Sequence, residues 1–246
     1  MRAMVLAAGL GTRLRPLTND RPKALVEVGG RTMLEITLER LRAFGVREVI
    51  VNVHHYADMV IEYLRAHHNF EMRIEVSREG VLLDTGGGIK KAAWFFLEGG
   101  EGEPFLVHNV DVMSTIDLAA LFHAHTERDA LATLAVQDRA TSRYLLFNNE
   151  GELCGRRAGR DGTPEMVRAC AGTNALAFSG IHVLSPRLLK RMDEARAFSI
   201  IATYLRLAGE GEKILAFHAD AYQWRDLGKP ENVAEAAREL SAKGSE

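Results

Sequence analysis

The sequence predicts an α/β protein with a mainly parallel mixed sheet covered by helices on both faces. Short apolar runs alternate with amphipathic helical segments through the first half of the chain, an order that is typical of parallel sheets. The runs are continuously apolar, as in Val49-Ile50-Val51, which indicates strands that are buried on both faces. The predicted architecture is therefore a three-layer α/β/α sandwich.

The first half of the chain provides the alternating elements. The clearest is a helix at residues 32–44, where Thr32 and Glu35 have capping-box spacing and Gly45 can end the last turn. The other periodic segments have the lengths of ordinary strands and helices. We expect strands at 5–8, 48–53, 73–76, 105–110 and 131–136, and further helices at 56–67, 88–97 and 117–125.

The second half is less regular. Residues 144–147 and 152–154 flank a polar Asn-Asn-Glu-Gly turn, a pattern that predicts a β-hairpin, and we expect this hairpin to form a small lid. Residues 155–173 are polar and rich in Gly and Arg, so we expect a loop there. The remaining expected strands lie at 176–184, 214–218 and 223–227, and the remaining helices at 199–207 and 230–240.

Size, charge and cysteine content exclude several classes of protein. The chain has 246 residues, of which 47% are hydrophobic, and this is sufficient for one large domain. Its net charge of -2 offers no general attraction to nucleic acid or to an anionic membrane. Two cysteines make no disulfide framework, and neither a signal peptide nor a membrane-spanning segment is recognisable. We therefore expect a cytoplasmic protein without nucleic-acid or membrane partners.

A glycine-rich run, AGLGTRLRPLT, follows the first strand, where the ligands of parallel sheets bind. Gly9 and Gly11 let backbone N–H groups approach an anion, and Thr12 and Arg13 add a hydroxyl and a guanidinium. The run lacks the third glycine of the dinucleotide fingerprint and the Gly-Lys-Ser/Thr of the Walker loop. Glycines alone would equally fit a simple reversal of the chain. The nearby cations Arg13 and Lys23 favour a phosphate site.

Two aspartates stand at the carboxyl ends of predicted strands that are far apart in the sequence. Asp111 follows the apolar strand 105–110, and Asp226 lies in the strand 223–227. Magnesium is commonly bound by one or two carboxylates together with substrate phosphates and water. A lone aspartate more often caps a turn or a helix, so each residue alone is weak evidence. As a pair they form our hypothesis for a metal site.

The glycine-rich run and the following Pro22-Lys23 resemble the signature of the sugar-1-phosphate nucleotidyltransferase family. The resemblance extends more weakly over almost the whole chain. It implies a Rossmann-like nucleotidyltransferase fold, Mg²⁺ as the cofactor, and joining of a nucleoside triphosphate to a sugar 1-phosphate with release of pyrophosphate. It also implies a set of nucleotide-binding residues, which are Ala7, Ala8, Gly9, Gly11, Thr12, Arg13, Lys23, Thr85 and Gly86.

The two aspartates match the metal-binding positions of that family. One follows the central strand, and the other lies in an aromatic-x-Asp-x-Gly segment, here Trp224 to Gly228. The resemblance thus implies Asp111 and Asp226 as metal ligands, and Arg13, Lys23 and Asp111 as catalytic residues. The family usually has Gly before its first aspartate, whereas this chain has Val110. We expect the larger side chain to narrow the sugar pocket.

The base and sugar sides resemble the short bacterial muramate-type uridylyltransferases. A glycine run begins at Gly86, where hexose enzymes have Gly-x-Ala-x-Ala, and this favours UTP and a role in cell-wall synthesis. A flexible helix start explains the same run about as well. Residues implied for the sugar phosphate are Asn109, Ser179 and Gly180. The family's Glu-Lys-Pro motif is absent, and the candidates to replace its lysine are Arg143, Arg156, Arg157 and Arg168.

The resemblance implies a single domain over residues 1–246. Residues 1–138 would form the nucleotide-binding half, and residues 139–246 the sugar-phosphate-binding half with the lid. We expect a monomer or small homo-oligomer. Two alternatives stay open: a phosphocholine-type cytidylyltransferase on the same fold, and a catalytically silent nucleotide-binding module. A magnesium-dependent glycosyltransferase would need an Asp-x-Asp pair, but Val112 and Met113 follow Asp111.

Overall fold

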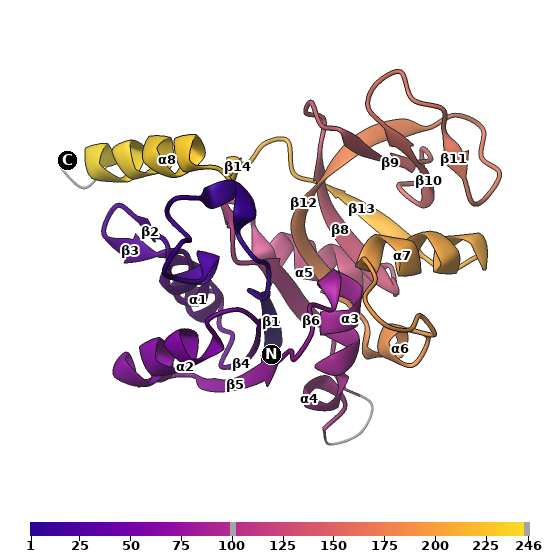
Figure 1. Ribbon diagram of the computed structural model, residues 1–246. Helices are drawn as coiled ribbons and strands as arrows, with labels where there is room; N and C mark the ends of the chain where they lie inside the picture. The colour runs from indigo at the N-terminus through magenta and orange to yellow at the C-terminus, as the bar shows by residue number, and fades with distance from the viewer. Residues whose placement is uncertain (99–101, 244–246) are drawn as a thin grey trace. The chain divides into compact units, whose positions relative to one another are not determined.

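The computed structural model describes residues 1–98 and 102–243, and the chain forms two compact units. Both units are assembled from separate stretches of sequence. The first unit contains Met1–Leu82, His108–Thr115 and Trp224–Glu246, and the second contains Leu83–Val107 and Ile116–Gln223. The N-terminal strand and the C-terminal helix, indigo and yellow in Figure 1, therefore belong to the same unit.

A parallel sheet forms the core of the first unit. It consists of β1 (Arg2–Leu6), β4 (Glu48–Val53) and β5 (Arg73–Arg78), with β4 in the middle. All residues of β1 after Arg2 are buried, as are all residues of β4 after Glu48, as their apolar sequences predict. The expected strand 5–8 begins earlier and ends at Leu6, because Ala7 N–H leaves the ladder and donates to a side chain.

The helices of the first unit begin and end largely as the sequence predicts. In α1 (Met33–Ala43) the Thr32 hydroxyl accepts a hydrogen bond from Glu35 N–H (3.1 Å), and Gly45 follows the helix with φ of 99°. The fully buried face of α1 includes Leu34, Leu38 and Leu41. The remaining helices are α2 (Ala57–Ala66), α8 (Pro230–Lys243) and the short 3-10 helices η1 (Thr12–Leu14), η2 (Lys23–Leu25) and η3 (His68–Glu71).

Two small antiparallel ladders complete the first unit. β2 (Glu27–Val28) pairs with β3 (Arg31–Thr32), and β7 (Val112–Ser114) pairs with β14 (Trp224–Asp226). Helix α8 lies beside β2 and β3 in Figure 1. A Cβ atom added at Gly29 would lie 3.4 Å from Leu240 of α8. Ion pairs from Arg225 to Glu235 and Glu239 tie α8 to β14.

The second unit is built on a mostly antiparallel sheet. Its strand order is β13-β8-β12-β9-β10-β11, and the only parallel pair among these described strands is β13 with β8. β6 (Phe105–Asn109) starts in this unit and ends in the first. The strands are β8 (Ala132–Gln137), β9 (Arg143–Phe147), β10 (Leu153–Ala158), β11 (Glu165–Met166), β12 (Asn174–Leu184) and β13 (Ile214–His218).

Among the residues that the structure describes, five helices belong to the second unit. They are α3 (Asp84–Lys91), α4 (Ala93–Leu97), α5 (Leu118–Glu127), α6 (Pro186–Leu189) and α7 (Ile200–Gly209). The single helix expected at 88–97 is in fact two helices, and the first begins at Asp84. The glycine run lies inside this first helix, where a Cβ atom on Gly86 would collide with the ring of Phe198. Close packing therefore explains glycine at this position.

The expected hairpin is confirmed as β9 and β10, but the loop prediction for residues 155–173 is wrong at its start. β10 continues to Ala158, and β11 pairs with it at Arg156 and Glu165. An ion pair also joins these two side chains (2.6 Å). β10 is buried only up to Gly155, and the two residues of β11 are exposed, so this part of the sequence lacks the apolar alternation that reveals a strand. In residues 1–98 and 102–243, no helix has both the length and the apolar character that crossing a bilayer requires.

Candidate active site

The glycine-rich loop leaves β1 and makes room for a lysine side chain. Gly11 adopts a left-handed conformation (φ 64°) and precedes η1, and its carbonyl accepts a hydrogen bond from the Thr18 hydroxyl (2.8 Å). A Cβ atom at Gly9 would lie 3.1 Å from Lys23 Nζ, and one at Gly11 would lie 3.0 Å from Lys23 Cβ. The two glycines therefore let the Lys23 side chain cross the loop at close range.

Lys23 reaches Asp111, the first of the two aspartates. Nζ lies 3.0 Å from Asp111 Oδ2, and the side chains are only 14% and 15% exposed. Burial alone would raise the pKa of Asp111. The charge and hydrogen bond of Lys23, with smaller contributions from a backbone hydrogen bond and from Arg13, outweigh burial and hold this pKa below its ordinary value. Asp111 is therefore an ionised carboxylate at neutral pH.

Arg13 and Asp226 form a second and more exposed pair. Arg13 Nη1 lies 4.0 Å from Asp226 Oδ2, with side chains 63% and 37% exposed. Asp226 Oδ1 accepts a hydrogen bond from Gly228 N–H (2.8 Å). A Cβ atom at Gly228 would lie 2.7 Å from Arg13 Nη2 and 2.8 Å from Asp226 Oδ1. The absence of a side chain at this position lets the guanidinium approach the carboxylate.

The two pairs lie together although their residues are far apart in sequence. In the ladder of β14 with β7, Asp226 is opposite Val112, the neighbour of Asp111, and Leu227 N–H donates to the carbonyl of Asp111 (2.8 Å). Val110 N–H donates to the carbonyl of Leu6 (3.1 Å), so the turn that carries Asp111 lies beside the end of β1. Two carboxylates and two cations thus gather at the carboxyl end of the parallel sheet.

This donor set fits a hard divalent cation. Carboxylate oxygens are ligands that Mg²⁺ prefers, and it commonly takes only one or two of them, with phosphate oxygens and water completing the shell. In the part of the chain that the structure describes, no group of three or more His, Cys, Asp or Glu side chains could hold a metal ion. The two carboxylates alone would leave coordination positions for phosphate oxygens of a substrate and for water.

The start of the loop is held by a buried polar network that the sequence analysis missed. Ala7 N–H donates to Asn52 Oδ1 (2.7 Å), and Asn52 Nδ2 donates to Glu79 Oε1 (2.8 Å). Asn52 and Glu79 are each 2% exposed. The amide of Ala7 is thus used to anchor the loop, and Ala8 is buried beside it. A polar Asn at the end of the apolar β4 was the signal that could have revealed this network.

Thr85 and Gly86 lie in the second unit, where their polar groups have partners. The Thr85 hydroxyl accepts a hydrogen bond from Ile200 N–H (3.0 Å). The N–H groups of Gly86 and Gly87 both donate to the carbonyl of Phe198 (2.9 and 3.3 Å). These contacts hold α3 against the start of α7, so the amides of the glycine run serve packing. The contact of Thr85 and Gly86 with a nucleotide stays a prediction.

The residues expected at the sugar phosphate are also divided between the units. Asn109 ends β6 and is half-buried in the first unit. In the second unit, Ser179 is completely buried, and Gly180, with φ of 74°, lies at an irregularity in the pairing of β12 with β8. Val110 is 1% exposed, so it belongs to the core and not, as we expected, to the wall of a sugar pocket.

Three of the four arginines proposed to replace the missing lysine are already engaged in the second unit. Arg156 and Arg168 form ion pairs with glutamates, and the Arg157 guanidinium lies 5.7 Å from the centre of the Tyr144 ring. Arg143 is exposed. These contacts favour none of the four as the replacement.

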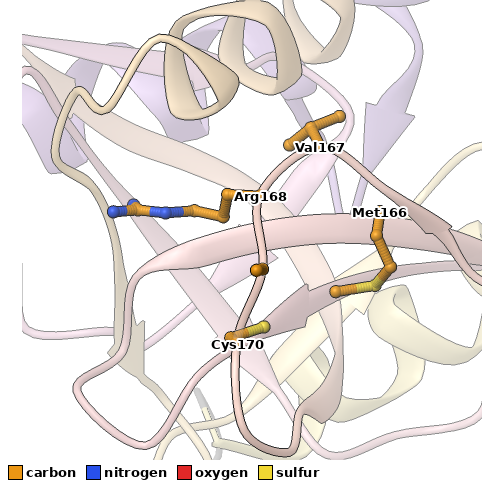
Figure 2. Close-up of a pocket in the computed structure, with 5 residues that line it drawn as sticks. Met166, Val167, Arg168 and Cys170 are labelled. Carbon is orange, nitrogen blue, oxygen red and sulfur yellow. The ribbon is translucent and has the colours of Figure 1, made fainter.

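A cavity of about 410 Å³ in the second unit lies along the segment from Met166 to Cys170. Figure 2 shows the Met166 and Cys170 side chains on one side of this segment, while Arg168 extends away on the other. Arg168 pairs with Glu152 (3.3 Å). Of the described residues that line this cavity, Arg168 alone was a candidate for the sugar phosphate, and its guanidinium is paired with Glu152.

The sequence pattern of the nucleotidyl transferase family matches residues 2–243. The chain belongs to this family. It is 37% identical over 250 residues to an N-acetylmuramate alpha-1-phosphate uridylyltransferase of Caulobacter vibrioides, with 97% of this chain and 96% of the relative covered. It is 31% identical to a mannose-1-phosphate guanyltransferase of Aspergillus fumigatus, but spans only 62% of that protein. This nucleotidyltransferase is therefore an enzyme whose relatives make nucleotide sugars.

Solved structures share the fold of this nucleotidyltransferase. HddC from Yersinia pseudotuberculosis, complexed with GMP-PN, superposes with a TM-score of 0.77 at 22% identity, and 97% of this chain and 99% of that one are covered. A UDP-glucose pyrophosphorylase complexed with UDP-glucose gives 0.79 at 18% identity, with 98% of each chain covered. The predicted fold class, a mixed sheet with flanking helices in a Rossmann-like nucleotidyltransferase fold, is confirmed.

Proposed function

We propose that this nucleotidyltransferase transfers UMP from UTP to a sugar 1-phosphate, with Mg²⁺ as cofactor, and gives a UDP-sugar and pyrophosphate. The observation that carries the proposal is the pairing of Lys23 with Asp111 directly beside Asp226. The identity with the Caulobacter uridylyltransferase extends over nearly all of both chains and supports UTP. It makes N-acetylmuramate 1-phosphate the first acceptor to test, in a cytoplasmic route to cell-wall precursors.

The chemistry needs charge neutralisation more than proton transfer. The acceptor phosphate is largely ionised at neutral pH, since its second pKa is about 6. One of its oxygens attacks the α-phosphorus of UTP in line, while the bond from this phosphorus to the bridging oxygen breaks and pyrophosphate leaves. Two polyanions must approach each other for this attack. Arg13 and Lys23 offset their repulsion and the charge that develops on the leaving group.

The two aspartates complete the proposed catalytic set. Asp111 and Asp226 would hold Mg²⁺, which supplies further neutralisation of the phosphate oxygens when it is bound. The low pKa of Asp111 keeps its carboxylate charged and able to act as a ligand at neutral pH. Ala7, Ala8, Gly9, Gly11 and Thr12 would surround the triphosphate.

Other parts of the proposal rest on the family resemblance. Thr85 and Gly86 would contact the nucleotide, and Asn109, Ser179 and Gly180 the sugar phosphate. The expected assignment of residues 1–138 to the nucleotide and 139–246 to the sugar phosphate belongs to the same proposal. So does a monomer or small homo-oligomer that works on small molecules alone.

Pyrophosphate release tests this function. Four nucleoside triphosphates are each combined with 1-phosphates of N-acetylmuramate, N-acetylglucosamine, glucose and mannose, and with phosphocholine, in the presence of Mg²⁺. We expect release with UTP and a sugar 1-phosphate, and none from the Asp111→Asn variant under the same conditions. Release only with CTP and phosphocholine would replace this proposal by the cytidylyltransferase. Tight UTP binding without release from any acceptor would favour a silent nucleotide-binding module.

A further inference from the structure

A buried hydrogen-bond network lies behind the turn that carries Asp111. β6 leads into this turn and β7 leads out of it. Arg40 of α1 donates through Nη1 to Ser114 Oγ in β7 (2.7 Å), and the same nitrogen lies 3.3 Å from His108 Nε2 in β6. One guanidinium nitrogen therefore bridges the two strands that flank the aspartate.

The hydrogen bonds fix the state of His108. This side chain is 1% exposed, and its Nδ1 lies 2.8 Å from the carbonyl oxygen of Asn109. A carbonyl can only accept, so Nδ1 carries the hydrogen, and Nε2 accepts from Arg40, which can only donate. Burial, and then the positive charge of Arg40, lower the pKa of His108 to about 3, so the ring is neutral at neutral pH. The network is thus consistent in every donor and acceptor role that these contacts assign.

Backbone pairing connects the strands of this network to both candidate metal ligands. Ser114 is opposite Trp224 in the ladder of β7 with β14, and in the same ladder Val112 is opposite Asp226. The Asp111 carbonyl accepts from Leu227 N–H at the end of this ladder (2.8 Å). Arg40 therefore bonds to both strands that flank the turn, β6 and β7. β14 pairs with β7 and so places Asp226 beside the turn.

We propose that Arg40 is a positioning residue for Asp111 and Asp226. It holds β6 and β7 at a fixed separation, so that both carboxylates face a divalent cation with little rearrangement. This role rests on the proposed function. Burial lowers the pKa of Arg40 to about 10, yet it stays protonated at neutral pH. Residues that orient metal ligands through hydrogen bonds commonly change metal affinity by about 10- to 100-fold when they are removed.

The test compares two arginines of the same helix. Arg42 also uses Nη1, donating to Glu71 Oε2 (2.8 Å) and to the carbonyl of Phe70 (3.4 Å). Both partners belong to η3, which is not part of the ladder of β7 with β14. Electron paramagnetic resonance measures binding of Mn²⁺ to Arg40→Met and Arg42→Met in the presence of a non-hydrolysable UTP analogue. We expect Arg40→Met to weaken Mn²⁺ binding about 10- to 100-fold, and Arg42→Met to leave it unchanged.

Turnover at increasing Mn²⁺ separates positioning from loss of folded protein. Saturating Mn²⁺ should restore much of the lost kcat of Arg40→Met, with the KM for the sugar phosphate little changed, because a metal ion compensates for weaker ligand orientation but not for unfolding. If Arg40→Met does not fold, Ser114→Ala is the variant to measure. It removes the hydrogen bond from Arg40 Nη1 to Ser114 Oγ (2.7 Å) and should weaken Mn²⁺ binding several-fold. Wild-type Mn²⁺ affinity in the folded variant would overturn the positioning role. Pyrophosphate release by the wild type judges the proposed function separately.

Discussion

The two ion pairs of the candidate site differ in burial, and this difference separates two roles. Lys23 and Asp111 are 14% and 15% exposed and lie 3.0 Å apart, whereas Arg13 and Asp226 are 63% and 37% exposed and lie 4.0 Å apart. A buried pair costs much free energy when one partner is removed, because the other charge is left uncompensated. An exposed pair contributes little to stability and can exchange partners readily. We therefore expect the first pair to support both the structure and the proposed chemistry, and the second pair to support the proposed chemistry alone.

The largest effect is expected from the buried carboxylate. Asp111→Asn keeps the shape of the side chain but removes the charge that would hold the cation. We expect kcat to fall about 10³-fold, which corresponds to about 4 kcal/mol of lost transition-state stabilisation. Steady-state pyrophosphate release measures this effect, and circular dichroism checks the fold. Turnover within a few-fold of wild type would remove Asp111 from the mechanism.

The next prediction compares the two cations directly. Lys23→Met and Arg13→Met should each lower kcat, by about 10²-fold, more than they weaken UTP binding. Their stabilities should differ, because only Lys23→Met leaves a buried carboxylate without its partner. We expect a loss of about 2 kcal/mol for Lys23→Met and less than about 1 kcal/mol for Arg13→Met in urea unfolding. Equal losses would show that burial does not distinguish the pairs.

A smaller effect should follow from closing the space beside Asp226. In Gly228→Ala the new methyl group would meet Arg13 Nη2 and Asp226 Oδ1 at 2.7 and 2.8 Å, so the exposed pair must separate. We expect nucleotide-dependent Mn²⁺ affinity to fall about 5-fold, or roughly 1 kcal/mol. Gly80→Ala is the control, because nothing lies within 4 Å of its added Cβ and its φ, like that of Gly228, is not in the left-handed region. Equal Mn²⁺ affinity in both variants would contradict this reading of Gly228.

The smallest effect concerns acid stability. The folded pKa of Asp111 lies below its ordinary value of 3.8, so the unfolded chain binds this proton first as pH falls. The stabilisation is complete above about pH 4 and disappears as pH falls through the folded pKa. The difference in unfolding free energy between wild type and Lys23→Met should therefore be constant near neutrality and shrink below about pH 4. A difference that grows with acid would show the opposite shift of the pKa.

Sequence reasoning reached the residues whose chemistry is local. The cap of α1 at Thr32 and Glu35, the two halves of the β9–β10 hairpin, and the strand ends at Asp111 and Asp226 follow from short patterns. Arg40 and Arg42 show the limit of such patterns. They stand two residues apart in the same helical sequence, yet only Arg40 contacts the strands around Asp111. Which arginine faces a polar network depends on tertiary packing, and no spacing rule reports it.

The network of Asn52 and Glu79 was missed for a related reason. A polar residue within an apolar strand can mark an edge, a bulge or a buried anchor. The partner of Asn52 is Glu79, which follows β5 and is distant in sequence. β11 was missed because it consists of only two exposed residues, Glu165 and Met166, which are too few to show any alternation. The interleaved division of the chain could not be read from sequence either, since it depends on which segments pack together.

Because the two units are interleaved in the sequence, the residues of the candidate site are synthesised at widely separated times. The loop with Arg13 and Lys23 is made first, and the turn with Asp111 follows after the first crossing into the second unit. The strand β14, which carries Asp226, is translated only after the second unit and just before α8. A growing chain therefore carries both cations and Asp111 before Asp226 is made, so the four side chains can come together only after the second unit has been translated.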